Sequence, residues 1–143
     1  MDAKEPKKRA DRQVSGLAGE FFVAAELLKR DVQTSVTFGN AKAIDLLAHN
    51  ADTGQSFTVQ VKTLRTSNYF TVDREKVVPN HVYVFVLLNK PNQPVRYFVV
   101  RGSELKEHPE QFGKGFFHPT WPGILPRDLL KFENNWPVFG CRT

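Results

Sequence analysis

The chain has 143 residues, which is enough for one domain with a buried core. Its 41% hydrophobic and 24% charged residues are ordinary for a globular protein, and its net charge of +5 favours a polyanionic partner. The single cysteine, Cys141, excludes an internal disulfide and a zinc knuckle, so a reducing, cytoplasmic setting is expected.

The N-terminal segment is highly charged and has no apolar centre, which excludes a secretory signal. We predict a basic, flexible arm over residues 1–12 and a single domain over residues 13–143. For the arm, a solvated tail and a nucleic-acid contact both remain open. No membrane association is expected, because the longest apolar run, Val82 to Leu88, has the length of a buried strand.

A first helix is predicted between Ser15 and Arg30, where apolar residues recur at three- and four-residue spacing behind Ser15 as the N-cap. Gly16 and Gly19 each cost a helix about 1 kcal/mol relative to alanine. We therefore expect both glycines to allow a close approach of the helix to a sheet. Glu20 lies one residue off the apolar stripe, so its carboxylate is expected to lean toward the sheet edge.

Three strands are predicted after this helix, over residues 33–38, 43–47 and 57–62. The turn-rich segment at residues 50–54 would join the second and third strands as a hairpin. Because side chains alternate along a strand, Gln60 and Lys62 share one face of the third strand. The hairpin would bring them to the same end of the sheet as Asp45.

The second half of the chain predicts two more strands and further helices. Near-continuous apolar residues over 81–89 indicate a central strand that is covered on both faces. The strand at residues 95–101 would run antiparallel to it. Also expected are a short strand or irregular link at 69–72, a helical turn at 73–77, a helix over 104–112 that Ser103 caps and Pro109 interrupts, a loop over 113–126, a helix over 127–134, and a core seal of Trp136, Val138 and Phe139. This order predicts an α+β (α/β/α-like) fold with a mixed central sheet of about five strands flanked by helices.

The polar groups at the hairpin suit a divalent cation beside a phosphate. Mg²⁺ prefers oxygen ligands, usually one or two carboxylates together with waters and substrate phosphates. Asp45 would be the main ligand, Gln60 and the main-chain carbonyl of Val61 would supply neutral oxygens, and Glu20 would add a second carboxylate. Lys62 would orient or deprotonate an attacking water, or neutralise charge on the phosphoryl group. An ordinary exposed or ion-paired role for Asp45 and Lys62 is the alternative.

These residues resemble the PD-(D/E)xK nuclease superfamily, which includes restriction endonucleases and archaeal Holliday-junction resolvases. The matching stretches are Gly16-Leu17-Ala18-Gly19-Glu20, Ile44-Asp45-Leu46-Leu47 and Val59-Gln60-Val61-Lys62-Thr63. The resemblance implies that Asp45 is the metal-binding aspartate, Lys62 the catalytic lysine, and Glu20 the extra acidic residue that some branches keep. Gln60 departs from the pattern, because an acidic residue usually stands there, and the change should weaken metal affinity.

By the same resemblance, the function would be a metal-dependent endonuclease-like domain that hydrolyses phosphodiester bonds in DNA with Mg²⁺ or Mn²⁺. RNA remains open as a substrate, and a homodimer is one expected arrangement. The alternative is a catalytically inactive nucleic-acid-binding or protein-binding module on the same fold. Lys42 and Arg65 flank the predicted site and are candidate phosphate contacts, with a solvated role as the alternative.

The sequence gives little support for other kinds of catalytic or binding site. The histidines at 49, 81, 108 and 118 show no metal-ligand spacing with each other or with Cys141, and Cys141 has no histidine near it in sequence. The aromatic residues Phe112, Phe116, Phe117 and Trp121 would either pack in the protein or stack on unpaired bases, and packing is the favoured interpretation.

Overall fold

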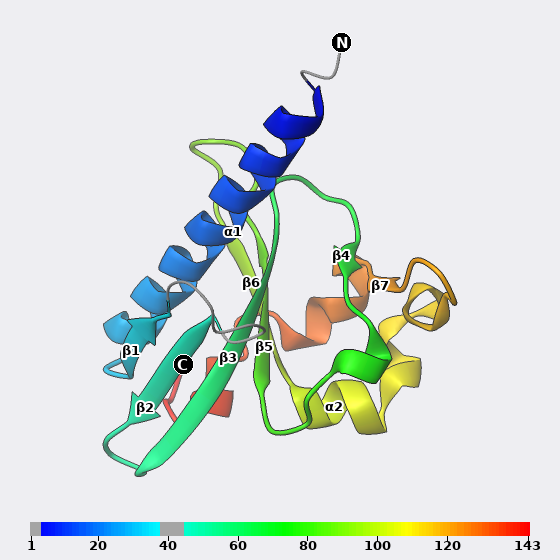
Figure 1. Ribbon diagram of the computed structural model, residues 1–143. Coiled ribbons are helices and arrows are strands. Elements are labelled where there is room, and N and C mark those ends of the chain that lie inside the picture. The colour runs from blue at the N-terminus through cyan, green and yellow to red at the C-terminus, as the bar shows by residue number, and fades with distance from the viewer. Residues whose placement is uncertain (1–3, 38–44) are drawn as a thin grey trace.

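The computed structural model describes residues 4–37 and 45–143, with side chains from residue 12 onward. Figure 1 shows a central sheet with a long helix, α1, on one face and a group of short helices on the other. The five strands are β1 (Gln33–Val36), β2 (Leu46–Asn50), β3 (Gln55–Leu64), β5 (Val82–Leu87) and β6 (Arg96–Arg101), in the spatial order β1-β2-β3-β5-β6. The β3–β5 pair is parallel and the other pairs are antiparallel, so the predicted mixed α+β sheet is confirmed.

Helix α1 (Lys4–Lys29) is one continuous helix, so the prediction that it begins at Ser15 is wrong. Lys, Arg, Ala and Glu dominate the residues before Ser15, and these residue types favour a helix even where they carry no apolar stripe. Ser15 is buried inside the helix, and its Oγ accepts a hydrogen bond from Arg65 Nε at 2.9 Å, so it makes a tertiary contact instead of a cap. The helix runs through the predicted arm boundary at residue 12, and the flexibility of the arm stays a prediction.

The packing of α1 on the sheet explains one of its two early glycines. A Cβ atom at Gly19 would overlap the side chain of Thr63 on β3, so the predicted close approach is confirmed there. No atom lies within 4 Å of a Cβ built at Gly16, so the prediction is wrong for that residue. Farther along α1, Val23 and Leu27 are fully buried in the core on this face of the sheet.

The hairpin of β2 and β3 carries the alternation that the sequence predicts. Leu46 and Ala48 are buried on the α1 side, whereas Leu47 is 48% exposed on the other face. The predicted strand at 43–47 begins at Leu46 and continues to Asn50, and Ala43, Ile44 and Phe38 lie outside the described residues. Gly54 takes φ +75° in the turn, which glycine adopts without strain.

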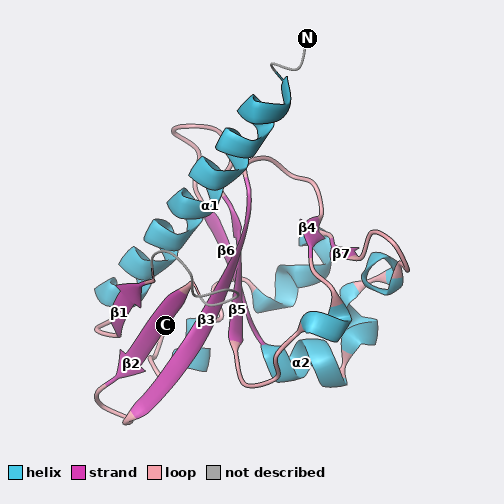
Figure 2. Cartoon of the chain, viewed as in Figure 1, coloured by secondary structure: helices cyan, strands magenta, loops and turns pink. Residues whose placement is uncertain are grey.

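A second core fills the other face of the sheet. The strand β5 is buried along its whole length, as predicted, because its alternate residues enter the two cores. Figure 2 shows that short helical segments make up most of the chain after β6. The remaining elements are β4 (Phe70–Thr71), η1 (Arg74–Lys76), α2 (Gly102–Glu107), η2 (Pro109–Phe112), η3 (Lys114–Phe117), β7 (Gly123–Ile124), η4 (Pro126–Phe132) and η5 (Trp136–Phe139), where η denotes a 3₁₀ helix.

Two helix predictions in this half need correction in part. The helix predicted over 104–112 ends at Glu107 and resumes as 3₁₀ turns at Pro109, so the predicted interruption is confirmed, because proline lacks the amide hydrogen that an α-helix would use there. Its N-cap is Arg101 and not Ser103. The last predicted helix, 127–134, is the 3₁₀ segment η4. The predicted core seal is confirmed: Trp136, Val138 and Phe139 are buried against the α1 side of the sheet.

Within the described ranges, no helix combines the length and the apolar character that a membrane crossing requires.

Candidate functional site

Asp45 stands immediately before β2 and is held by hydrogen bonds to Thr37, Val59 and Val61. Its N–H donates to the carbonyl of Val59 at 3.0 Å, although the strand register pairs Val59 with Leu46. Asp45 and Leu46 thus both oppose Val59, which is the pattern of a β-bulge. A bulge changes the direction of a side chain from the strict alternation of a strand. The Asp45 carbonyl accepts from Thr37 N–H, and its Oδ2 accepts from Val61 N–H at 2.8 Å. The carboxylate is therefore fixed at the rim of the sheet against the main chain of β3.

Glu20 reaches the same rim from α1. Its pKa is raised from an ordinary 4.5 to about 7, first by burial of the carboxyl and second by repulsion from Asp45. Repulsion of this kind acts between like charges, so the raised pKa agrees with the predicted grouping of Glu20 with Asp45. A shared role of the two carboxylates at a metal site stays a prediction.

Gln60 is only 6% exposed, and its side chain belongs to a polar network. Its Nε2 lies 2.9 Å from His81 Nδ1 and donates to the hydroxyl of Tyr83 at 3.0 Å. The same hydroxyl accepts from Val78 N–H. Burial lowers the pKa of His81, so the neutral ring that can accept from an amide is favoured. The amide oxygen Oε1 makes none of these hydrogen bonds.

The sequence analysis did not predict this network, although the alternation of residues along β5 could have indicated it. Tyr83 is the residue of β5 that pairs with Gln60, and His81 lies two residues before it on the same face. Alternation along β5 could have suggested that both rings face the amide. Gln60 also lies between Val59 and Val61, the two β3 residues whose main chains hold Asp45.

Lys62 is half-buried and lies where two clefts meet. The larger cleft, of about 880 Å³, is also lined by Arg12, Arg65 and Thr71. The smaller one, of about 210 Å³, is also lined by Gln60 and Thr71. Among the described side chains, no ion pair within 4.0 Å joins Lys62 to Asp45 or Glu20. Lys62 therefore shares a cleft with Gln60 but makes no direct contact with the two carboxylates.

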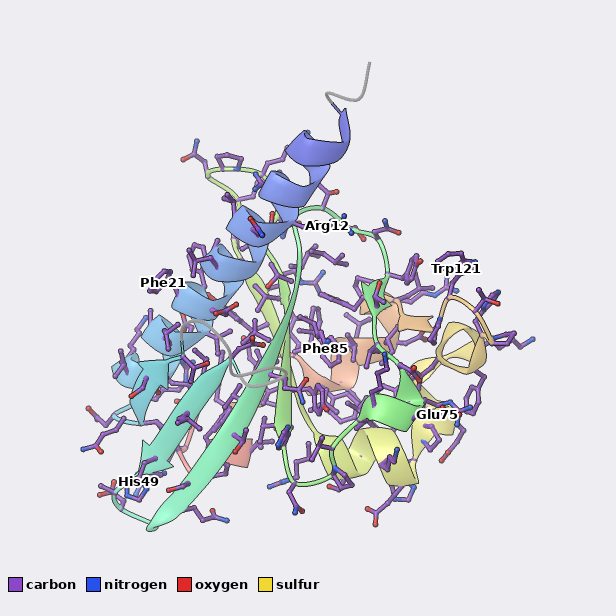
Figure 3. The ribbon with its side chains drawn as sticks, in the orientation of Figure 1. Arg12, Phe21, His49, Glu75, Phe85 and Trp121 are labelled. Carbon is purple, nitrogen blue, oxygen red and sulfur yellow. The ribbon has the colours of Figure 1, made fainter. Side chains whose placement is uncertain are left out.

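The two predicted phosphate contacts have different outcomes. Arg65 lines the larger cleft, and its bond to Ser15 anchors the guanidinium beside α1. Arg12 lines the same cleft. Figure 3 shows this residue on the side of α1 nearest the link from β3 to β4. Lys42 lies outside the described residues.

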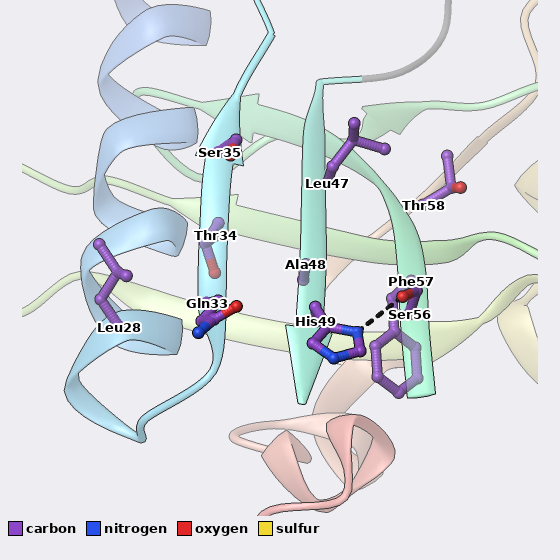
Figure 4. A pocket seen from close by; sticks show the side chains of 10 residues that line it. All are labelled: Leu28, Gln33, Thr34, Ser35, Leu47, Ala48, His49, Ser56, Phe57 and Thr58. Atoms are coloured by element: carbon purple, nitrogen blue, oxygen red, sulfur yellow. Dashed lines mark hydrogen bonds between the residues drawn. The ribbon is translucent and has the colours of Figure 1, made fainter. Parts of the chain in front are cut away.

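A further hollow lies over β1, β2 and β3, away from this chemistry (Figure 4). Its lining holds no carboxylate and none of the predicted site residues. His49 Nδ1 lies 2.8 Å from Ser56 Oγ, which is the one hydrogen bond that Figure 4 marks between the residues drawn there.

Within the described residues, no group of three or more His, Cys, Asp or Glu side chains is arranged to hold a metal.

Comparison with known proteins locates the fold. Neither a family model nor a curated protein matches the sequence. Hjc, a Holliday junction resolvase from the archaeal hyperthermophile Archaeoglobus fulgidus, has 15% identity and a TM-score of 0.56 over 90% of this chain and 98% of its own. The bacterial homing endonuclease I-Ssp6803I has 13% identity and a TM-score of 0.57 over 88% of this chain and 90% of its own.

The chain has a restriction-endonuclease-like fold. The resemblance that the sequence suggested is thereby confirmed at the level of the fold. At these identities the likeness to other PD-(D/E)xK structures extends no further, so the roles of Asp45, Gln60, Lys62 and Glu20 stay predictions.

Proposed function

We propose that this protein is a metal-dependent endonuclease-like domain that hydrolyses phosphodiester bonds in DNA. The observation that carries the proposal is the pair of carboxylates, Asp45 and Glu20, at the rim of a nuclease-type sheet. A fold alone does not specify an activity, so the chemistry of the rim has to support the function. The named activities of the two structural neighbours, junction resolution and endonuclease cleavage, favour DNA over RNA as the substrate.

The residues at the rim fit a divalent cation such as Mg²⁺ or Mn²⁺. Asp45 and Glu20 supply two carboxylates, which is the usual number for a protein-bound Mg²⁺. The amide oxygen of Gln60 and the carbonyl of Val61 would add neutral oxygens. When bound, the metal supplies positive charge that stabilises the developing charge on the phosphate. Because Gln60 replaces an acidic residue, Glu20 would carry the second negative charge of the site.

The side chains divide the remaining work. Asp45 is oriented before any ligand arrives, because Val61 N–H holds its Oδ2 and leaves Oδ1 for a ligand. Lys62, in the cleft beside Gln60, would position the attacking water or offset charge on the phosphoryl oxygens. Ordered placement of the nucleophile and the phosphate can account for a large part of the rate enhancement.

Substitution and cleavage assays test the proposal. Asp45→Ala and Lys62→Ala should each reduce Mg²⁺- or Mn²⁺-dependent cleavage of DNA by at least about 100-fold, a typical effect for one such group. Asp52→Ala and Lys90→Ala are matched controls, since both residues are exposed in turns, and both should cleave like the parent protein. Equal cleavage by all four variants would assign the activity to other residues or to a contaminant.

A non-catalytic binding module is the second candidate function. The capture of Gln60 by His81 and Tyr83 favours it, because a buried, hydrogen-bonded amide is a weaker ligand than a free carboxylate. Calorimetric titration with Mn²⁺ in the presence of DNA separates the two functions. Absence of heat at millimolar Mn²⁺, together with salt-sensitive DNA binding, would favour the binding module.

A further inference from the structure

The C-terminal aromatic residues divide into two groups with different surroundings. Phe112 and Phe116 are fully buried in the second core, as the favoured interpretation of the sequence predicts. Phe117 and Trp121 instead leave 44% and 69% of their surfaces exposed. Tryptophan is rarely left this open on a surface unless it contacts a partner, and it is among the residues that contribute most at interfaces.

The loop that carries Trp121 is held in place. Nδ1 of His118 accepts hydrogen bonds from the N–H groups of Thr120, at 3.1 Å, and Trp121, at 2.8 Å. Pro122 follows directly, and its carbonyl accepts from Val72 N–H at 3.3 Å. The indole is therefore presented outward on a preformed loop, as Figure 3 shows at the side of the molecule near β7. Little conformational entropy would be lost when a flat ligand stacks on it.

Cationic side chains lie beside Phe117 and in the loop segment. The guanidinium of Arg74 lies 4.3 Å from the ring centre of Phe117, and its Nε donates to the carbonyl of Phe116. Between residues 111 and 127 the sequence contains Lys114 and Arg127 and no acidic residue. A surface of aromatic rings and cations suits nucleobases with their phosphates better than it suits an apolar protein surface.

The loop also adjoins the cleft that contains Lys62. Gly123, two residues after Trp121, pairs with Thr71 in the β4–β7 ladder, and Thr71 lines both clefts around Lys62. The ring of Tyr69 packs so closely on Gly123 that a Cβ there would overlap it. The short sheet therefore connects the aromatic loop to Thr71 in the wall of the cleft.

We propose that Trp121 and Phe117 form a stacking surface for unpaired nucleobases, next to a cleft in which Arg12, Arg65 and Lys62 contact the phosphates. The inference deepens the proposed function and rests on its assignment of DNA as the ligand. It specifies the substrate class: DNA with an unpaired segment, such as a gap, a flap or an open junction, is bound in preference to a continuous duplex.

Intrinsic fluorescence tests the inference without metal and without cleavage. The chain has two tryptophans, and Trp136 is 1% exposed, so a change on adding oligothymidylate in EDTA reports mainly Trp121. We expect quenching in the parent protein and none in Trp121→Phe. Fluorescence that is unchanged in the parent protein at saturating oligonucleotide would overturn the proposal.

Binding isotherms of the variants identify the type of contact. Trp121→Ala should weaken binding of oligothymidylate by about 5- to 100-fold, as expected for one stacked base, with an unchanged salt dependence. Trp121→Phe should lose less affinity. Arg65→Ala should reduce the slope of log affinity against log salt by about 1, because it removes a phosphate contact. Leu28→Ala, at another exposed apolar residue, on α1, is the control and should bind like the parent protein.

The outcomes separate this inference from the proposed function. If the parent protein does not cleave DNA but Trp121→Ala still loses oligonucleotide affinity, the stacking surface stands and the nuclease assignment fails. If Trp121→Ala binds single strands and duplex as the parent protein does, the stacking surface is wrong whatever the cleavage result. Concentration-dependent self-association that Trp121→Ala abolishes would instead assign the loop to a contact between copies of the chain and overturn the proposal.

Discussion

At the scale of single residues, the candidate site depends on the direction of the Asp45 side chain at the start of β2. Asp45 departs from the alternation of β2 because its N–H and Leu46 both oppose Val59, and its carboxylate turns onto the main chain of β3. That turn allows Asp45 to interact with Glu20 from α1 although Gln60 and Lys62 lie along the other face of β3. The rim of the sheet is the place where groups from both faces can meet.

The raised pKa of Glu20 makes a prediction about stability. A carboxyl whose pKa rises to about 7 on folding favours the folded state at low pH, and this contribution is lost as the pH rises from 4.5 through 7. In EDTA at about pH 9, Glu20→Gln should therefore be more stable than the parent protein by on the order of 1 kcal/mol, since water screens a partly exposed charge. At about pH 4 the difference should vanish.

Chemical denaturation at the two pH values checks this prediction, with Glu107→Gln, an exposed residue, as the control. Addition of Mn²⁺ should reverse the order at high pH, because only the parent protein retains both carboxylates for the cation. A Glu20→Gln variant that is less stable than the parent protein at high pH in EDTA would show that burial and repulsion from Asp45 do not raise the pKa of Glu20.

At the scale of elements, the contact of α1 with β3 positions Glu20. Gly19 lies directly against Thr63, whose Oγ1 is buried without a hydrogen-bond partner, and the next residue carries the carboxylate to the rim. The glycine weakens the helix but lets it approach the sheet closely. The two early glycines of α1 therefore offer a matched pair of substitutions.

Gly16→Ala and Gly19→Ala should change stability in opposite directions. Alanine at Gly16 meets open space and should stabilise the protein by up to about 1 kcal/mol. Alanine at Gly19 must displace Thr63, at a cost of roughly 1–3 kcal/mol that exceeds the gain in helix propensity. Thermal denaturation measures both, and Thr63→Ala should recover part of the loss in the Gly19→Ala background. Stabilisation by Gly19→Ala alone would mean that the helix does not approach the sheet so closely.

At the scale of the whole molecule, much of the architecture could be predicted from periodicity. The alternation of Leu46, Leu47 and Ala48 and the unbroken apolar run of β5 correctly indicated a half-exposed hairpin and a central strand. The start of α1 could not be read in this way, since the residues before Ser15 favour a helix without forming an apolar stripe. The interruption of the helix at Pro109 was correctly predicted, because proline cannot donate the hydrogen bond that the helix needs there.

The candidate site was predictable in part, because its residues match the spacing of the nuclease superfamily that the sequence resembles. The electrostatic influence of Asp45 on Glu20 agrees with the predicted grouping, and the roles of both residues stay predictions. The capture of Gln60 by His81 and Tyr83 was not foreseen, because it depends on the parallel pairing of β3 with β5, which sequence patterns specify weakly. The separation of Phe117 and Trp121 from the buried Phe112 and Phe116 likewise depends on tertiary packing.

The most direct test of the central claim is the location of a bound cation. Crystals of the protein soaked in millimolar Mn²⁺ should show an anomalous peak at the rim, in contact with the carboxylates of Asp45 and Glu20 and near the carbonyl of Val61. The peak should be absent from Asp45→Asn crystals treated in the same way. Clear density for both carboxylates without a peak between them, or a Mn²⁺ ion bound elsewhere in the molecule, would contradict the account.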